Sequence, residues 1–459
     1  MASIALAVTA GTGLLVLVIA SWEGPIALRA LSWGAAGIVA CLISVLVLKR
    51  LLHWFSRHEL FSPFIAFPVT YTLWFALGSL TLWNERNVKV VQYSSIGLAC
   101  YFAGVVLAGW RAALRPSKPA FRNEWETSRF WLVVGALAAA TVLSYIYVIS
   151  RIGIIALASD AADRRMDLAK YGSVEAVLFT ASWTILVFVT AQLWTGSQHR
   201  VTRRLAWIGL CIIAVIILSL GSRGNLFVPF LTAVIARHYL RKRFHILKLA
   251  LLGIGMFVAL SFYGYTRDAT LARGSLSFTN GNATQAAILP AIYAYLYVRQ
   301  PVETLQEVIR VIPRTIPYQN GMLSFDALRT LLPGHHEMSD MFFKQILGSD
   351  FVGGGQPATL LGPLYGDFGL AGIVVGMFAV GVVVAKTHSW MLANPTVFRV
   401  LIYAWLMQTV LFSLFGALIP YITTIWIPLF WWFLDAALLR RPAFALRTPD
   451  LSQTAPVQT

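Results

Sequence analysis

The chain consists largely of long apolar stretches, separated by shorter segments that hold most of its polar and charged residues. Each stretch approaches or exceeds the length of about 17 residues at which a helix can cross the hydrocarbon core of a membrane. Because lipid offers no hydrogen-bond partner to backbone N–H and C=O groups, such stretches are expected to be helices. The predicted spans lie near residues 3–20, 27–48, 64–82, 93–110, 130–150, 174–195, 205–221, 225–240, 247–265, 358–385, 398–417 and 420–438.

The fold class that follows is all-α, a polytopic transmembrane helical bundle of about twelve spans. Residues 1–448 are expected to form a single transmembrane domain, and the polar tail 449–459 is expected to be disordered. Two segments between spans, 151–173 and 266–356, are longer than ordinary connections. They are predicted to be structured loops on one face of the membrane.

Basic residues gather in alternate loops, those that follow every second span, and in the C-terminal tail. These segments hold 21 basic and 4 acidic residues, and the difference equals the whole net charge of +17. Loops rich in lysine and arginine stay in the cytoplasm. The pattern therefore predicts a bacterial inner-membrane protein with both termini in the cytoplasm and the two long loops in the periplasm.

Composition narrows the class further. Hydrophobic residues make up 58% of the chain and charged residues only 12%, about half the charged share of a soluble domain. The excess of 36 basic over 19 acidic residues lies beside the spans, so its cause is topological and no nucleic-acid partner is expected. The three cysteines fall within apolar stretches, which excludes a disulfide framework or a cysteine metal site.

Both long loops are expected to contain helices. The shorter loop predicts one helix that begins after Ser159 and ends at Gly172. In the longer loop, residues 286–298 predict an interfacial or re-entrant helix, and residues 301–312 predict a second helix that starts at Pro301. This longer loop is predicted to fold against the membrane surface.

Several arginines fall on the predicted periplasmic face, against the usual bias of membrane topology. Span seven ends in a Gly-Ser-Arg-Gly turn at 221–224, whose glycines let a bulky anion approach the backbone. A guanidinium group binds phosphate bidentately, so convergent arginines suit a lipid-linked pyrophosphate. Taken singly, Arg223 also fits an interfacial arginine near lipid headgroups, Arg164 an i,i+4 pair with Asp160, and Arg267 a salt bridge with Asp268 or a headgroup contact. The candidate pyrophosphate-binding residues are Arg223, Arg164, Arg165, Arg267 and Arg273.

Four residues are candidate catalytic groups. His335, His336 and Glu337 stand together in the longer loop and could supply a general base, although adjacent histidines do not have a metal-ligand spacing. A solvated loop is the alternative interpretation. Asp367 lies near the outer end of a span, where a carboxylate is costly unless it is hydrated or paired, for instance with one of the outer arginines.

A glycine-rich stretch leads into span ten. Gly372 and Gly376 have the spacing of small residues that let two membrane helices pack closely. Tyr365 and Gln356 in the same stretch, with Tyr318 in the longer loop, are candidate substrate-binding residues. The chain contains no P-loop, dinucleotide-binding glycine motif or HExxH motif, so no cofactor and no metal are expected.

The arrangement resembles the oligosaccharide repeat-unit polymerases, the O-antigen polymerase family, which is itself similar to the O-antigen ligases. Two motifs carry the resemblance: the GSRG turn at 221–224 and the sequence GGGQPATLLGPLYGDFG at 353–369. The large outer loop lies between them, as it does in the family. The resemblance implies a GT-C-type fold and a metal-independent glycosyltransferase.

That family transfers a growing polysaccharide from undecaprenyl pyrophosphate onto an incoming lipid-linked repeat unit, commonly with a chain-length co-polymerase as partner. By resemblance, Arg223 matches the family's arginine in the turn, Arg164 or Arg165 the arginine of the earlier loop, and Arg267 and Arg273 its later arginines. His335 or His336 matches the histidine of the ligases' large loop. The family often has an uncharged residue where this chain has Asp367.

Two other functions remain open at this point. A ligase that transfers finished glycan to lipid A core would use the same fold and leaving group. A polysaccharide transporter or flippase is the non-enzymatic alternative, but such proteins usually carry charged pairs at mid-membrane and two similar halves, which this sequence does not show.

Overall fold

A computed structural model describes most of the chain from residue 59 onward. The described residues are 59–79, 85–109, 124–153, 172–196, 199–220, 223–241, 283–329, 339–347, 355–416 and 422–439, with scattered positions from 244 to 258. In this part the fold is helical, apart from an isolated bridge between Trp125 and Leu439. The helices are α3 (Ala66–Ser79), α4 (Glu85–Leu107), α6 (Thr127–Ile152), α8 (Gly172–Thr195), α9 (Arg200–Ser219), α10 (Arg223–Leu240), α13 (Ala283–Val311), α14 (Asp326–Arg329), α15 (Ser339–Ile346), α16 (Leu361–Ala393), α17 (Val397–Phe412) and α18 (Ile422–Leu438).

Five of the described helices are long and apolar enough to cross a membrane: α4, α6, α8, α9 and α16. They confirm the predicted spans near 93–110, 130–150, 174–195, 205–221 and 358–385. Helices α3, α10, α17 and α18 lie at four further predicted spans and are 14 to 18 residues long. The predicted spans near 3–20 and 27–48 lie outside the described residues, as does most of the one near 247–265.

The apolar side chains of two spanning helices face outward. On α6, Leu132 and Leu143 are 75% and 66% exposed, and on α9 Ile212 and Val215 are 54% and 64% exposed. A soluble protein would bury such residues, whereas a bilayer solvates them. Together with the helix lengths, this surface identifies a helical membrane protein.

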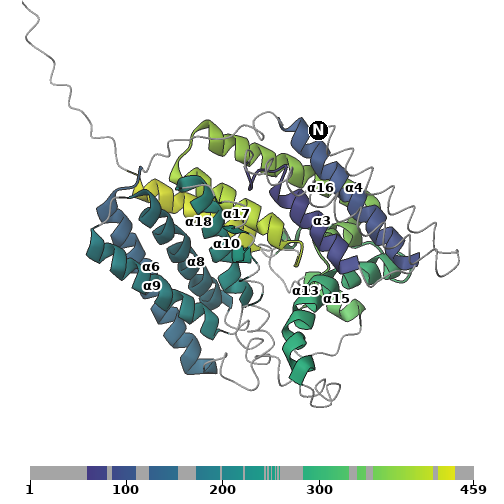
Figure 1. Cartoon of the computed structure of the whole chain (residues 1–459), viewed down its shortest axis with the longest axis horizontal. Helices are drawn as coiled ribbons and strands as arrows, with labels where there is room; N and C mark the ends of the chain where they lie inside the picture. The colour runs from purple at the N-terminus through teal and green to yellow at the C-terminus, as the bar shows by residue number, and fades with distance from the viewer. Residues whose placement is uncertain are drawn as a thin grey trace, which may run out of the picture.

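The described helices form two groups that α10 and α17 join (Figure 1). Helices α6, α8 and α9 pack on one side, and α3, α4, α13 and α16 pack on the other. The join is aromatic: the rings of Trp183 (α8) and Trp405 (α17) lie 5.9 Å apart, and Trp431 (α18) lies 5.5 Å from Trp405. The α18 helix packs on α17 and completes this interface.

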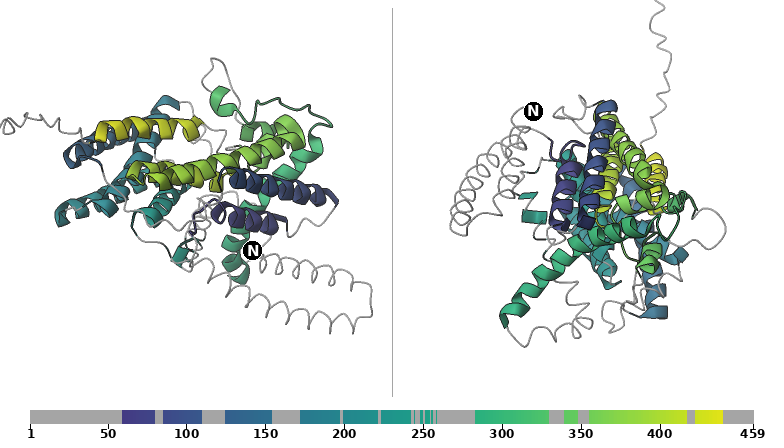
Figure 2. Two further views of the ribbon diagram at one scale, coloured as in Figure 1. Left: turned by 90° about the horizontal axis from the view of Figure 1, so that it is seen from above. Right: turned by 90° about the vertical axis from the view of Figure 1, so that its right-hand side faces the viewer.

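Helices α4 and α16 touch through their backbones along the second group (Figures 1 and 2). A Cβ atom on Gly104 of α4 would lie 2.2 Å from the carbonyl oxygen of Phe378, and one on Gly381 of α16 would lie 2.2 Å from that of Tyr101. Lipid supplies little hydrophobic force between helices, so association depends on close packing of this kind. The two glycines therefore set the spacing and register of α4 and α16.

The start of α16 folds back on itself at Gly369. This residue has φ 62° and ψ −145°, a conformation that glycine adopts without the strain of a side chain. As a result, a Cβ on Gly372 would lie 2.0 Å from the carbonyl oxygen of Leu364, and one on Gly376 would lie 2.5 Å from the Leu364 side chain. The expected close packing at Gly372 and Gly376 is present, and the neighbour is the short helical segment of α16 that precedes the bend at Gly369.

Residues 286–312 of the longer loop lie in one helix where the sequence predicted two. Helix α13 runs from Ala283 to Val311 without a break at Pro301. A proline inside a helix removes one backbone hydrogen bond, and here the packing of the following turns compensates: Val302, Leu305 and Val308 are all buried. The prediction of a helix start at Pro301 is therefore wrong, although both predicted segments are helical.

A buried polar cluster joins four segments at the end of the bundle where α10 and α16 finish. The Glu59 carboxylate lies 3.3 Å from Nε2 of His388 on α16, and the hydroxyl of Tyr239 on α10 lies 3.4 Å from the same nitrogen. Tyr403 of α17 packs on the His388 ring and donates a hydrogen bond to the carbonyl oxygen of Phe61. A buried charge persists only with such partners, so this cluster holds the chain before α3 against α10, α16 and α17.

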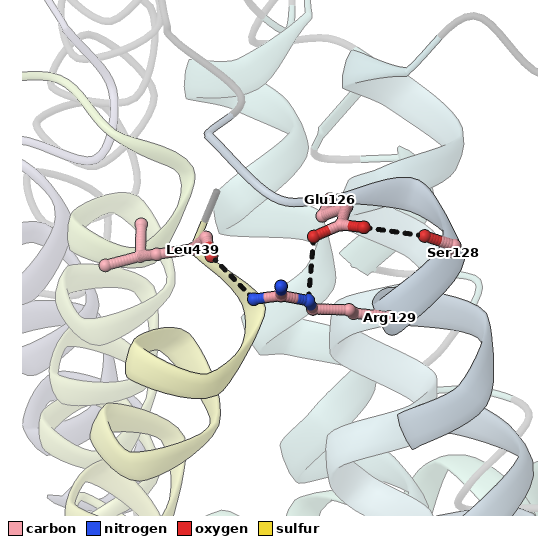
Figure 3. Close-up of polar contacts among 4 residues, drawn as sticks. All are labelled: Glu126, Ser128, Arg129 and Leu439. Atoms are coloured by element: carbon pink, nitrogen blue, oxygen red, sulfur yellow. Dashed lines mark hydrogen bonds and ion pairs between the residues drawn. The ribbon is translucent and has the colours of Figure 1, made fainter. Parts of the chain in front are cut away.

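The start of α6 is fastened to the end of α18 (Figure 3). The indole N–H of Trp125 donates a hydrogen bond of 2.7 Å to the Asp435 carboxylate. The Arg129 guanidinium pairs with Glu126 at 2.7 Å and donates a hydrogen bond of 3.4 Å to the carbonyl oxygen of Leu439. A cation at this position also satisfies a carbonyl group that the end of a helix leaves unpaired.

The contact between α4 and α16 can be tested with alanine substitutions. Gly104→Ala adds a methyl group where the opposite backbone lies 2.2 Å away, so we expect the protein to lose about 1–3 kcal/mol of stability. Gly135 on α6 has nothing within 4 Å of such a methyl group, so Gly135→Ala is the matched control and should be neutral or stabilising. The measurement is the midpoint of thermal unfolding in detergent. Equal midpoints for the two variants would contradict the close contact.

Candidate functional site

The residues predicted from the sequence fall into two sets. Those outside the described residues are Arg164, Arg165, Arg267, Arg273, His335, His336 and Glu337. Arg223 is the first residue of α10, and its backbone position is described. Tyr318, Gln356, Tyr365 and Asp367 are described with their side chains. All of these described positions lie at one end of the bundle, where α10 and α16 begin and α13 and α17 finish; we call it the loop end.

Arg223 and Gly224, the described residues of the Gly-Ser-Arg-Gly motif, begin α10 beside the end of α17. A Cβ on Gly224 would lie 3.8 Å from the ring of Phe412, the last residue of α17. One turn later, the rings of Phe227 and Phe412 lie 5.4 Å apart. This packing places the backbone of Arg223 next to the turn that follows α17.

The glycine-rich stretch reaches the same turn from the other direction. A Cβ on Gly416 would lie 3.7 Å from Cβ of Pro357. Phe415 lies beside it, with its ring 5.8 Å from Tyr297 of α13 and 6.5 Å from Trp74 of α3. The described parts of the two motifs, 223–224 and 355–369, are about 130 residues apart in the sequence and meet around the end of α17.

Asp367 fastens the loop after α13 to the folded-back start of α16. Its carboxylate accepts hydrogen bonds from the backbone N–H groups of Leu323 at 3.1 Å and Ser324 at 2.6 Å. The side chain is fully buried, and the backbone N–H of Gln319 adds a bond of 3.0 Å to the carbonyl oxygen of Gly366. Buried N–H groups that lose their acceptor are costly, so Asp367 determines where residues 313–325 lie.

Three tyrosines gather where this loop meets α16. The ring of Tyr365 stacks on Tyr93 of α4, with centroids 5.5 Å apart, and meets Tyr318 edge-on at 6.4 Å. The hydroxyl of Tyr365 donates a hydrogen bond of 3.3 Å to the carbonyl oxygen of Ile312. Tyr365 is buried and Tyr93 half-buried, whereas Tyr318 is 37% exposed. The tyrosines therefore form a supported aromatic surface with Tyr318 as its open side.

Gln356 lies in residues 355–360, a short segment before α16 that we call the strap. Its backbone N–H donates a hydrogen bond of 2.8 Å to the carbonyl oxygen of Asp340, the second residue of α15. A Cβ on Gly355 would lie 2.4 Å from Cβ of Asp340, so glycine is required for this approach. The strap thus brings α15, which follows the predicted histidine pair in the sequence, next to the start of α16.

The sequence did not single out Arg314, which lies in the loop beside Tyr365. The arginines of the preceding helix α13 are neutralised, Arg299 by Glu303 and Arg310 by Glu307. No carboxylate in the described part of the chain pairs with Arg314, and its side chain is exposed. The sequence spacing of arginine and glutamate residues could have identified Arg314. Glutamates three or four residues away neutralise the arginines of α13, whereas Arg314 has no acidic residue at either spacing.

The loop end thus combines an arginine at the start of α10, a second arginine beside an aromatic surface, and a loop held in place by a buried carboxylate. Guanidinium groups and tyrosine rings can bind a molecule that is both anionic and rich in C–H and hydroxyl groups. Within the described residues, no group of three histidine, cysteine or acidic side chains is placed to hold a metal ion.

Comparison with known proteins gives a family. Residues 59–414 match the family described as "Putative O-antigen polymerase", a region that includes both motifs and most of the described helices. No curated protein and no solved structure gives a significant match. Since the match covers well over half of the chain, the protein belongs to the O-antigen polymerase family.

Proposed function

We propose that the protein polymerises undecaprenyl-pyrophosphate-linked oligosaccharide repeat units at the periplasmic face of the bacterial inner membrane. Membership of the family supports repeat-unit polymerisation. The distribution of basic residues supports the orientation, with both termini in the cytoplasm and the loop end in the periplasm. The polymer is an O-antigen, a capsule or an exopolysaccharide, and each transfer moves the growing chain onto the incoming unit.

One observation carries this proposal: both motifs of the resemblance meet at the loop end. Gly224 lies against Phe412, and Pro357 lies against Gly416, so the arginine turn and the glycine-rich strap face the same turn after α17. A transferase needs its leaving-group contacts and its acceptor contacts in one place, because orientation removes much of the entropic barrier. Convergence of the two motifs satisfies that requirement.

The reaction we propose is an inverting displacement at an anomeric carbon. The bond between this carbon and the pyrophosphate oxygen of the donor breaks, and a bond to an acceptor hydroxyl oxygen forms. Arg223, with Arg164, Arg165, Arg267 and Arg273, stabilises the negative charge on the departing undecaprenyl pyrophosphate. A base from His335, His336 or Glu337 takes the proton of the acceptor hydroxyl. Neither a metal nor a nucleotide sugar takes part.

Asp367 has a positioning role in this proposal. Its two oxygens accept the N–H groups of Leu323 and Ser324, and the side chain is fully buried. A base must reach the acceptor hydroxyl directly or through one water molecule, which favours the residues of the longer loop. Asp367 acts through the segment 313–325, which it holds over the start of α16.

The role of Arg223 can be tested by complementation. In a strain that lacks the gene, complementation with wild type should restore a ladder of long glycan on a gel. Arg223→Ala should reduce polymer by about 100-fold or more, because it removes a group that binds charge developed in the transition state. Arg223→Lys should retain partial activity, since it keeps the charge and loses the bidentate geometry.

The matched control is Arg204→Ala, which removes an exposed arginine near the start of α9 and should give a wild-type ladder. Polymer at wild-type levels from Arg223→Ala would remove the pyrophosphate role. If the deletion strain still makes long polymer and leaves it on the lipid carrier, the protein is a ligase; if lipid-linked units accumulate on the cytoplasmic side, it is a flippase.

The second prediction separates the two roles of Asp367. Asp367→Ala leaves two N–H groups without an acceptor, at a cost of about 1–3 kcal/mol, and should free the loop. Tryptic cleavage after the exposed Arg314 should then speed up, and polymer should fall in parallel. Asp367→Asn keeps one acceptor oxygen and should be intermediate in both measurements.

A catalytic base would behave differently. Asp367→Asn would then abolish polymer as completely as Asp367→Ala, with no change in the rate of cleavage after Arg314. That result would replace the positioning role by the proton-accepting role.

A further inference from the structure

We infer that Arg314 and Tyr318, backed by Tyr365 and Tyr93, form a subsite that binds a pyranose ring of the lipid-linked glycan together with an adjacent anionic group. This inference rests on the proposed function and adds to it a place for the sugar. Sequence patterns gave Arg314 no role, and none of the proposed pyrophosphate contacts includes it.

The ring of Tyr318 is supported by Tyr365 and Tyr93. Tyr365 stacks on Tyr93 with an interplanar angle of 28°, and Tyr318 meets Tyr365 at 74°. Tyr365 is only 6% exposed and Tyr93 is half-buried, whereas Tyr318 is 37% exposed, so Tyr318 is the most accessible of the three to a ligand. A ring held from behind loses little entropy on binding, which favours its use as a recognition surface.

The loop that carries Tyr318 is held against the bend of α16. Gly369 has a positive φ, and a Cβ there would lie 2.7 Å from the hydroxyl oxygen of Tyr318. The ring of Tyr318 therefore lies directly over the backbone at the bend of α16. The bond from Gln319 N–H to the Gly366 carbonyl oxygen, at 3.0 Å, fixes the next residue. The aromatic surface is preorganised by the bend and by Asp367 together.

Arg314 supplies a positive charge next to these rings. It stands two residues after Ile312, whose carbonyl oxygen accepts the hydrogen bond of 3.3 Å from the Tyr365 hydroxyl, and its side chain is exposed. Arg299 and Arg310, on the preceding helix α13, each pair with a glutamate, whereas no carboxylate among the described residues pairs with Arg314. An exposed arginine in this position is suited to an anion brought by a ligand.

The chemistry of the ligand follows from these groups. One face of a pyranose ring presents C–H groups, which pack on the electron-rich face of an aromatic ring. The anionic group that Arg314 contacts is either the pyrophosphate of the carrier or an acidic substituent of the sugar itself. Both sources place a sugar on Tyr318 and a negative charge beside it.

The test measures binding to the full-length protein in nanodiscs. The probe is the repeat-unit oligosaccharide from a strain that carries the gene, released from its carrier by mild acid and observed by saturation-transfer NMR. Tyr318→Ala should weaken binding by about tenfold, the upper range of a stacked aromatic contact. Tyr318→Phe keeps the ring and should bind as wild type does, which separates stacking from a disturbed fold.

Arg314 is tested with the same probe and with inorganic pyrophosphate as competitor. If pyrophosphate binds wild type and about tenfold less well to Arg314→Ala, the anion is that of the carrier. If instead Arg314→Ala weakens binding of the oligosaccharide, and reduction of the sugar's carboxyl groups has the same effect, the anion belongs to the sugar. Either result supports the subsite.

The chain offers a matched control on α6. There Arg151 lies 5.6 Å from the ring of Tyr147, and Tyr147 is 40% exposed, so Tyr147→Ala and Arg151→Ala remove an equally exposed pair. These variants should bind as wild type does. The inference is overturned if Tyr318→Ala and Arg314→Ala bind both probes as the controls do.

That failure is distinguishable from failure of the proposed function. If the subsite variants bind normally but Arg223→Ala still abolishes the glycan ladder, the polymerase stands and the sugar binds elsewhere. If deletion of the gene leaves the ladder intact, the proposed function itself is wrong.

Discussion

The backbone contact between α4 and α16 is the constraint on which the loop end depends. Gly104 and Gly381 bring the two helices together without intervening side chains, and this spacing aligns Tyr93 with Tyr365 for stacking at 5.5 Å. In lipid, where apolar side chains are equally well solvated by neighbouring helices and by acyl chains, small residues and polar contacts determine which helices associate. A wider separation of α4 and α16 would leave Tyr365 without its neighbour and the aromatic surface without support.

Buried polar groups then position the loop that packs on α16. The bend at Gly369 turns Asp367 away from solvent and toward the N–H groups of Leu323 and Ser324. Buried N–H groups without an acceptor raise the free energy of the folded state. The Asp367 carboxylate accepts both of these hydrogen bonds and so avoids that cost. A charged residue at the end of a span suggests catalytic chemistry from the sequence alone. Here it orders a loop whose exposed residues we propose as a ligand subsite.

Hydropathy predicted much of the fold because the cost of unpaired backbone in lipid leaves few alternatives to a helix. It could not predict the start of α16, since Gly362, Gly366, Gly369, Gly372 and Gly376 are equally permissive in sequence and only Gly369 takes the positive φ. Proline is favoured in the first turn of a helix, so the sequence predicted a helix start at Pro301. In the structure α13 continues through Pro301, because the turns that follow it are packed in the core. Gln356, Tyr365 and Asp367 are candidates because they lie in the glycine-rich motif, and Tyr318 because it lies in the longer loop. Arg314 stands out only through the ion pairs of the arginines that precede it.

The cluster of Glu59, His388, Tyr239 and Tyr403 has a consequence for how the chain is made. The hydrogen bond from Tyr403 to the carbonyl group of Phe61 spans 342 residues of sequence, and His388, which faces the Glu59 carboxylate, comes from α16. The imidazole that faces Glu59 is therefore available only after α16 has been synthesised. Packing at this end of the bundle is completed only when α16 and α17 join the helices that precede them in the chain, so it is a late event in biogenesis.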